Sequence, residues 1–169
     1  MYKTGVIILS DKSYHGLRED LSGPIIEKML PEDKFKLERS VLLPDEKSLL
    51  LQELIYMADE LKLDLILTSG GTGFSPGDIT PEASMEAADR SAPGIAEAIR
   101  AFSMKLTKAA MFSRGVSVIR KGSLIINLPG SPKAVQEILE YLLPVLDHGL
   151  EVLGGRASEC ASLREERGK

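Results

Sequence analysis

Residues 68–83, TSGGTGFSPGDITPEA, constrain the fold more than any other part of this sequence. They follow an apolar run, LDLIL at residues 63–67, which is typical of a buried strand. Thr80 at a helix N-cap and Pro81 at the first helical position predict that a helix begins there. The loop between strand and helix holds four glycines. A junction of this kind leaves main-chain N–H groups uncovered, so an anion can approach the backbone closely.

One carboxylate, Asp78, lies in this loop, where by itself it repels an anion. The repulsion disappears if a divalent metal lies between Asp78 and a phosphate, or if the chemistry of the anion requires a carboxylate. The loop is not a Walker A motif, because no Gly-Lys-Ser/Thr follows, and Pro76 breaks the dinucleotide-binding pattern. We therefore predict phosphoryl or nucleotidyl chemistry here, against the alternative of a tight turn that needs glycine for its geometry alone.

Strand-like and helix-like segments alternate along the chain, and a Lys121-Gly122 turn suggests a hairpin near its end. This alternation predicts an α/β fold of three layers, α/β/α, in which helices cover both faces of a mainly parallel sheet. Asp45 is placed to cap the second long helix. We expect strands at residues 4–9, 35–43, 63–67, 115–119 and 123–128, and helices at 19–30, 45–61, 81–89, 95–106 and 132–153.

Four polar turns follow strands, at residues 10–11, 44–45, 70–78 and 127–131. In a parallel sheet the ligand crevice lies at the carboxyl ends of the strands, so we expect these turns to share one edge. Asp45 and Asp78 would then converge, and two carboxylates beside a triphosphate suit magnesium. Each aspartate alone also fits a structural role, as a helix cap or a turn residue. Spacing alone leaves their convergence open.

Composition excludes several classes of protein. A chain of 169 residues suits one domain, which we place at residues 1–155, before a charged tail at residues 156–169. A net charge of −4 argues against a nucleic-acid partner. No apolar run reaches the roughly 18 residues of a membrane span. The single cysteine, Cys160, excludes an internal disulfide, and we expect a cytoplasmic protein.

Two separated motifs resemble the molybdopterin-binding family of molybdenum cofactor biosynthesis. Residues 69–83 resemble the first signature of that family, and residues 127–134, NLPGSPKA, resemble the second. Pro44-Asp45 and Ser113-Arg114 match two further segments. The similarity extends from about residue 3 to residue 153, which is nearly the whole chain.

The resemblance implies an α/β/α domain that forms a homotrimer and acts as a molybdopterin adenylyltransferase. Such an enzyme uses ATP and Mg²⁺ to place AMP on the terminal phosphate of molybdopterin, and it releases pyrophosphate. The two functional aspartates of the family fall on Asp45 and Asp78. Many relatives carry a basic residue just before the second aspartate, where this chain has Gly77. The segments that contact the pterin and its phosphate fall on Gly70, Gly71, Thr72, Gly73, Ser113, Arg114, Asn127, Pro129, Gly130 and Ser131, and the nucleotide side on Ser10 and Asp11.

Two alternatives share the glycine loop with this interpretation. A molybdopterin carrier or scaffold would hold the same ligand without reacting, and it does not need the carboxylates. A nucleotide or dinucleotide hydrolase would release AMP or ADP from ATP in the absence of pterin. The dependence of ATP turnover on molybdopterin separates all three hypotheses.

Overall fold

A six-stranded sheet forms the centre of the molecule, with the strand order β2-β1-β3-β6-β5-β4. The computed structural model describes residues 1–155, so the tail predicted at residues 156–169 lies outside the described residues. The first four strands in this order pair in parallel. The last two lie at one edge, where β5 pairs antiparallel with β6 and β4 pairs antiparallel with β5. The strands are β1 (Tyr2–Leu9), β2 (Phe35–Leu43), β3 (Leu65–Ser69), β4 (Arg90–Ser91), β5 (Ser117–Arg120) and β6 (Ser123–Leu128).

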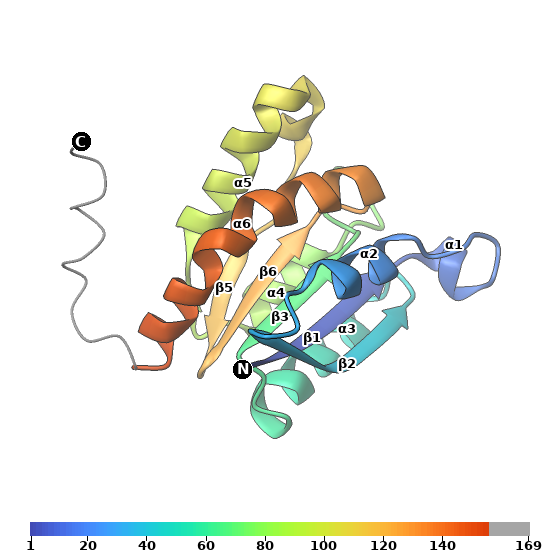
Figure 1. Cartoon of the computed structure of the whole chain (residues 1–169). Coiled ribbons are helices and arrows are strands. Elements are labelled where there is room, and N and C mark those ends of the chain that lie inside the picture. The colour runs from blue at the N-terminus through green and yellow to red at the C-terminus, as the bar shows by residue number, and fades with distance from the viewer. Residues whose placement is uncertain (156–169) are drawn as a thin grey trace.

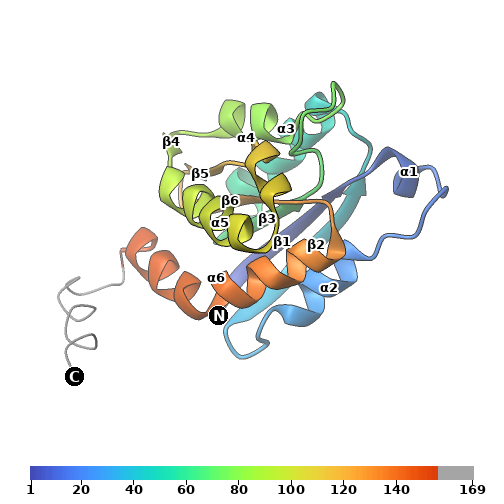
Figure 2. The same ribbon diagram turned by 90° about the horizontal axis from the view of Figure 1, so that it is seen from above.

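Helices cover both faces of this sheet, which confirms the predicted three-layer α/β/α fold (Figures 1 and 2). On one face lie α2 (Ser22–Met29), α5 (Pro93–Leu106) and α6 (Pro132–Leu153). On the other face lie α3 (Lys47–Ile55), which continues as a π-helical turn at Tyr56–Glu60, and α4 (Thr80–Ala87). A short helix, α1 (Asp11–Tyr14), follows β1, and a 3-10 turn at Lys108–Phe112 follows α5. None of the helices within residues 1–155 is long and apolar enough to cross a membrane.

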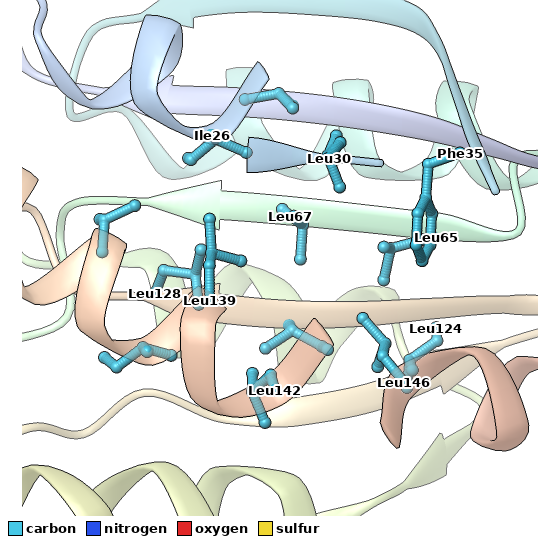
Figure 3. Close-up of a cluster of buried hydrophobic side chains, with 14 of the residues drawn as sticks. Ile26, Leu30, Phe35, Leu65, Leu67, Leu124, Leu128, Leu139, Leu142 and Leu146 are labelled. Atoms are coloured by element: carbon cyan, nitrogen blue, oxygen red, sulfur yellow. The ribbon is translucent and has the colours of Figure 1, made fainter. Parts of the chain in front are cut away.

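The sheet separates two apolar layers. Successive side chains of a strand point to opposite faces, so the continuous apolar run of β1 supplies both layers. Val6 and Ile8 pack in the layer beneath α2 and α6, while Ile7 and Leu9 pack in the layer beneath α3 and α4. Figure 3 shows the first of these layers, where leucines of α6 lie against β3 and β6. This two-sided burial fixes the register of the strands, and parallel pairing of β2, β1, β3 and β6 brings their carboxyl ends to one edge.

Four predicted helix starts differ from the structure: those of α2, α3, α4 and α5, and α5 begins at Pro93 rather than at residue 95. Hydrogen bonds that local sequence does not reveal account for the first three. Helix α2 begins at Ser22 rather than near residue 19, since Asp20 accepts a hydrogen bond from the backbone N–H of Ser22 at 2.9 Å. Thr80 lies inside α4 instead of capping it, and its hydroxyl donates to the carbonyl of Gly70 at 2.8 Å.

The turns after β1 and β2 also differ from the prediction. Asp45 does not cap α3, because Glu46 occupies that position. The carboxylate of Asp45 instead accepts a hydrogen bond from the backbone N–H of Asp11. The polar turn after β1 forms α1, with Ser10 as its N-cap.

Candidate functional site

The carboxyl ends of the parallel strands meet at one edge of the sheet, as the topology requires. The turns that follow them line an open cleft of about 710 Å³. Eight of the residues predicted from the sequence line this cleft: Ser10, Asp11, Asp45, Gly70, Gly71, Asp78, Gly130 and Ser131. Asp45 and Asp78 therefore face the same space, which spacing in the sequence left open.

Asp11 and Asp45 hold each other through reciprocal hydrogen bonds. The backbone N–H of Asp11 donates to Oδ2 of Asp45 at 3.1 Å, and the backbone N–H of Asp45 donates to Oδ1 of Asp11 at 2.8 Å. These two bonds join the turn after β1 to the turn after β2. The carboxylate of Asp45 is consequently fixed at the rim of the cleft.

Asp78 is oriented within its own loop. Its Oδ2 accepts a hydrogen bond from the backbone N–H of Ser75 at 2.9 Å, and its own N–H donates to the carbonyl of Ser75 at 2.9 Å. The loop therefore sets where this carboxylate lies relative to the cleft.

The cleft disfavours the ionised form of Asp45. Burial raises the pKa of Asp45 above its usual value, and the negative charges of Asp11 and Asp78 raise it further. The backbone N–H of Asp11 and the guanidinium of Arg18 act in the opposite direction. Gathered carboxylates of this kind favour a bound cation. Within residues 1–155 no group of three or more His, Cys, Asp or Glu side chains is arranged to hold a metal ion.

Glycine is required where the turn after β3 approaches β1, and the turn after β6 packs closely against the same loop. Gly70 has a φ of +103°, and a Cβ atom there would lie 2.3 Å from the carbonyl oxygen of Leu9. A Cβ on Gly130 would lie 3.3 Å from the Cα of Gly70. Gly71, at a φ of +63°, leaves no room for a Cβ beside the Thr80 hydroxyl. These glycines thus serve the geometry of the loop and also bring its backbone to the cleft.

A second, apolar cavity of about 290 Å³ lies beside the cleft, between α5, the 3-10 turn and the start of α6. Apolar side chains such as Ile99, Phe112 and Ile138 form much of its surface. Thr72 directly follows Gly71, and Pro129 directly precedes Gly130. The glycine loop and the turn after β6 therefore form the wall shared by the cavity and the cleft. Five of the predicted site residues line the cavity: Thr72, Gly73, Ser113, Asn127 and Pro129.

The polar groups of Asn127 point into the protein rather than toward a ligand. Asn127 is 4% exposed, and its Nδ2 donates to the hydroxyls of Thr68 and Ser84, each at 2.9 Å. Its Oδ1 accepts from the backbone N–H of Val116 at 3.2 Å. Arg114, also predicted as a ligand contact, directs its guanidinium at the carbonyls of Gly73 and Asp78. A direct role for Asn127 and Arg114 in ligand binding stays a prediction.

Sequence reasoning missed two cations of the cleft, Lys12 and Arg18. Nη2 of Arg18 donates to the hydroxyl of Ser10 at 3.1 Å, which draws the segment after α1 over the cleft. Both residues follow Ser10-Asp11 closely in the sequence, after the first strand, and this position could have indicated a place at the cleft. Because surface cations are common, that signal could not distinguish them from solvated residues.

The chain is similar to known proteins over most of its length. A family model described as a probable molybdopterin binding domain matches residues 5–148. The molybdopterin adenylyltransferase of Helicobacter pylori strain J99 is 40% identical over 156 residues, covering 89% of this chain and 87% of its own length. The enzyme of the same name from Escherichia coli K12 is 40% identical over 141 residues, covering 82% and 72%. The crystal structure of the molybdopterin biosynthesis enzyme MoaB of Thermus thermophilus superposes with a TM-score of 0.87 at 43% identity, covering 94% and 100%.

The glycine at position 70 gives a direct test of the wall between cleft and cavity. We expect Gly70→Ala to lower the free energy of unfolding by at least about 1–3 kcal/mol. Alanine is strained at this positive φ, and its Cβ would clash with the Leu9 carbonyl oxygen. Gly77→Ala in the same loop is the matched control, since a Cβ at Gly77 meets no atom within 4 Å. Urea denaturation measures both variants. Equal stability of the two would contradict the close packing described here.

Proposed function

Since the chain belongs to the molybdopterin-binding family, we propose that it is a molybdopterin adenylyltransferase, an enzyme that joins the AMP portion of ATP to the terminal phosphate of molybdopterin. Curated relatives at about 40% identity over most of the chain carry that name, which supports an enzyme over a carrier or scaffold. The observation that carries the proposal is the pair of carboxylates, Asp45 and Asp78, lining one cleft beside an apolar cavity. A carrier has no need of that pair.

The two spaces suit the two substrates. The apolar cavity between α5 and α6 matches a flat pterin, whose ring needs apolar walls and a few polar groups. The polar cleft matches the nucleotide, with Lys12 and Arg18 available to its phosphates. The shared wall of glycine loop and β6 turn then lies beside both reacting phosphates, where the two spaces adjoin. Backbone N–H groups of this wall can approach a phosphate closely, because Gly70, Gly71 and Gly130 carry no side chain.

In adenylyl transfer the protein itself contributes little covalent chemistry. A terminal phosphate oxygen of molybdopterin forms a bond to the α-phosphorus of ATP. The bond from that phosphorus to the oxygen bridging the β-phosphate breaks, and pyrophosphate leaves with the oxygen and its electron pair. The contribution of the chain is to hold both anions in line and to exclude water from the phosphorus. Rigid attachment of Asp45 to Asp11, and of Asp78 to Ser75, suits this positioning role.

Magnesium is the cation that fits the donor set of the cleft. Asp45 and Asp78 offer carboxylate oxygens, and the nucleotide would supply the remaining ligands, which is the usual arrangement for this ion. The raised pKa of Asp45 supports the fit, because a cation would offset the repulsion from Asp11 and Asp78. Bound there, the ion would screen the charge between the two phosphates.

We also propose that the protein works in the cytoplasm. Its single cysteine, Cys160, cannot form an internal disulfide, which suits a reducing compartment.

The two carboxylates are tested by Asp45→Asn and Asp78→Asn. We expect either change to lower the rate of pyrophosphate formation from ATP, Mg²⁺ and molybdopterin by about 100-fold or more, with the affinity for molybdopterin nearly unchanged. Asp33→Asn, at an exposed aspartate in the turn before β2, is the matched control. A variant that turns over at the wild-type rate would remove its aspartate from the mechanism. Release of AMP or ADP without molybdopterin would instead favour a hydrolase.

The raised pKa of Asp45 predicts a dependence of stability on pH. A carboxyl whose pKa is higher in the folded state holds its proton more firmly there, so its contribution to stability falls as pH rises above its ordinary value of 3.8. Asp45→Asn removes that loss and keeps an acceptor for the Asp11 N–H. We expect the Tm of the variant, relative to wild type, to increase between pH 4 and pH 7 in the absence of ligands. A Tm difference that decreases over this range would contradict the described charge balance.

We also propose that the chain assembles as a homotrimer, as the resemblance to its family implies. The end of α5 and the 3-10 turn project beyond the sheet (Figure 1) and expose Leu106, Met111 and Phe112, each more than 50% accessible. The ring of Phe112 packs against exposed Phe74 with 5.4 Å between centroids, which extends the apolar patch. Sedimentation should give three times the 18.4 kDa of the chain, and Met111→Glu should reduce it. A monomer at micromolar concentration would overturn the proposal.

A further inference from the structure

Arg114 lies between the 3-10 turn and β5, and its first contacts are with the glycine loop. Its backbone N–H donates to the carbonyl of Thr72 at 2.8 Å. Its Nε donates to the carbonyl of Gly73 at 2.6 Å. Both acceptors belong to the beginning of the loop that carries Asp78.

The other end of the guanidinium reaches the end of the same loop. Nη2 donates to the carbonyl of Asp78 at 2.6 Å, and Nη1 pairs with the carboxylate of Glu82 in the first turn of α4. The hydrogen bonds from Arg114 lower the pKa of Glu82, so this ion pair persists at neutral pH. A single planar side chain thus joins the start of the loop, its end and the helix that follows.

These contacts differ from those of an arginine that binds a ligand phosphate. Among residues 1–155, those that line the cleft and the apolar cavity include Ser113 but not Arg114. The side chain of Arg114 is 33% exposed, yet Nε and both Nη atoms already donate to protein acceptors. The fork is therefore directed at the loop and at α4.

We propose that Arg114 is a positioning residue, which holds the loop from Gly73 to Asp78 closed and so fixes the carboxylate of Asp78 at the cleft. The inference rests on the proposed function, because it takes its significance from the role of Asp78. The orientation of that carboxylate depends on the Ser75 N–H within the same loop. When the loop loosens, the carboxylate loses its place even though its own charge is unaltered.

Arg114→Lys tests the proposal, because lysine keeps the charge while one ammonium cannot reach acceptors on Gly73, Asp78 and Glu82 together. We expect the rate of pyrophosphate formation at saturating substrates to fall about 10- to 100-fold. The dissociation constant of molybdopterin, measured by titration, should change by less than about threefold. The double variant with Asp78→Asn should be no slower than Asp78→Asn alone, because Arg114 acts through Asp78.

Arg120→Lys is the matched control. Arg120 makes a similar fork to the carboxylate of Asp59 and donates to the carbonyl of Ala87, at 2.6–2.9 Å, on elements that do not line the cleft. Hydrogen exchange of the amides of residues 72–80 should accelerate in Arg114→Lys and stay at the wild-type rate in Arg120→Lys. This readout needs no turnover, so it separates a failure of the positioning role from a failure of the proposed function.

Three results would overturn the inference. One is a loss of molybdopterin affinity of about tenfold or more in Arg114→Lys with wild-type turnover at saturation, which would make Arg114 a ligand-binding residue. Another is an unchanged exchange rate in the loop of Arg114→Lys. The third is full additivity of the Arg114→Lys and Asp78→Asn losses in the double variant.

Discussion

The close approach of three backbone segments at the carboxyl ends of β1, β3 and β6 is the constraint on which the site depends. Gly70 fits against the carbonyl of Leu9 only because it has no side chain and can adopt a φ of +103°. A Cβ on Gly130 would lie 3.3 Å from the Cα of Gly70, so these two turns also pack closely. With these contacts, the turns after two strands become one wall, with a polar cleft on one side and an apolar cavity on the other. A side chain at Gly70 would push the turn after β3 away from β1 and disturb this wall.

Hydrogen bonds to backbone N–H groups hold the two carboxylates beside this wall. Asp45 is fixed by Asp11 and Asp78 by Ser75, so both carboxylates stay in place despite their mutual repulsion. Such an arrangement costs stability in the absence of a cation, and it creates an attraction for one. Functional sites often retain strain of this kind, because it prepares the site for the charge of its ligand.

The sequence predicted the fold well because buried strands and alternating elements leave a strong pattern. The strands at residues 35–43 and 123–128 and the helix at residues 132–153 match those observed. The first residues of the helices were harder to predict. Asp45 and Thr80 form hydrogen bonds with residues 34 and 10 positions away instead of capping their helices. Local rules for caps do not include such distant competitors.

The sequence predicted which turns form the candidate site, but not that these turns divide a polar cleft from an apolar cavity. Residue types marked the glycine loop and the two aspartates, whereas strand order decided that they face one cleft. The orientation of Arg114 and Asn127 depends on acceptors in other elements, which no local pattern reveals. Lys12 and Arg18 were missed for a related reason, because their place follows from the path of the chain after β1.

A crystal structure with molybdopterin and a non-hydrolysable ATP analogue is the most direct test of this account. It should place the pterin ring between α5 and α6, the nucleotide phosphates between Asp45 and Asp78, and a phosphate oxygen of the pterin about 3–3.5 Å from the α-phosphorus. Nucleotide phosphates bound away from both aspartates, or a pterin outside the apolar cavity, would contradict it.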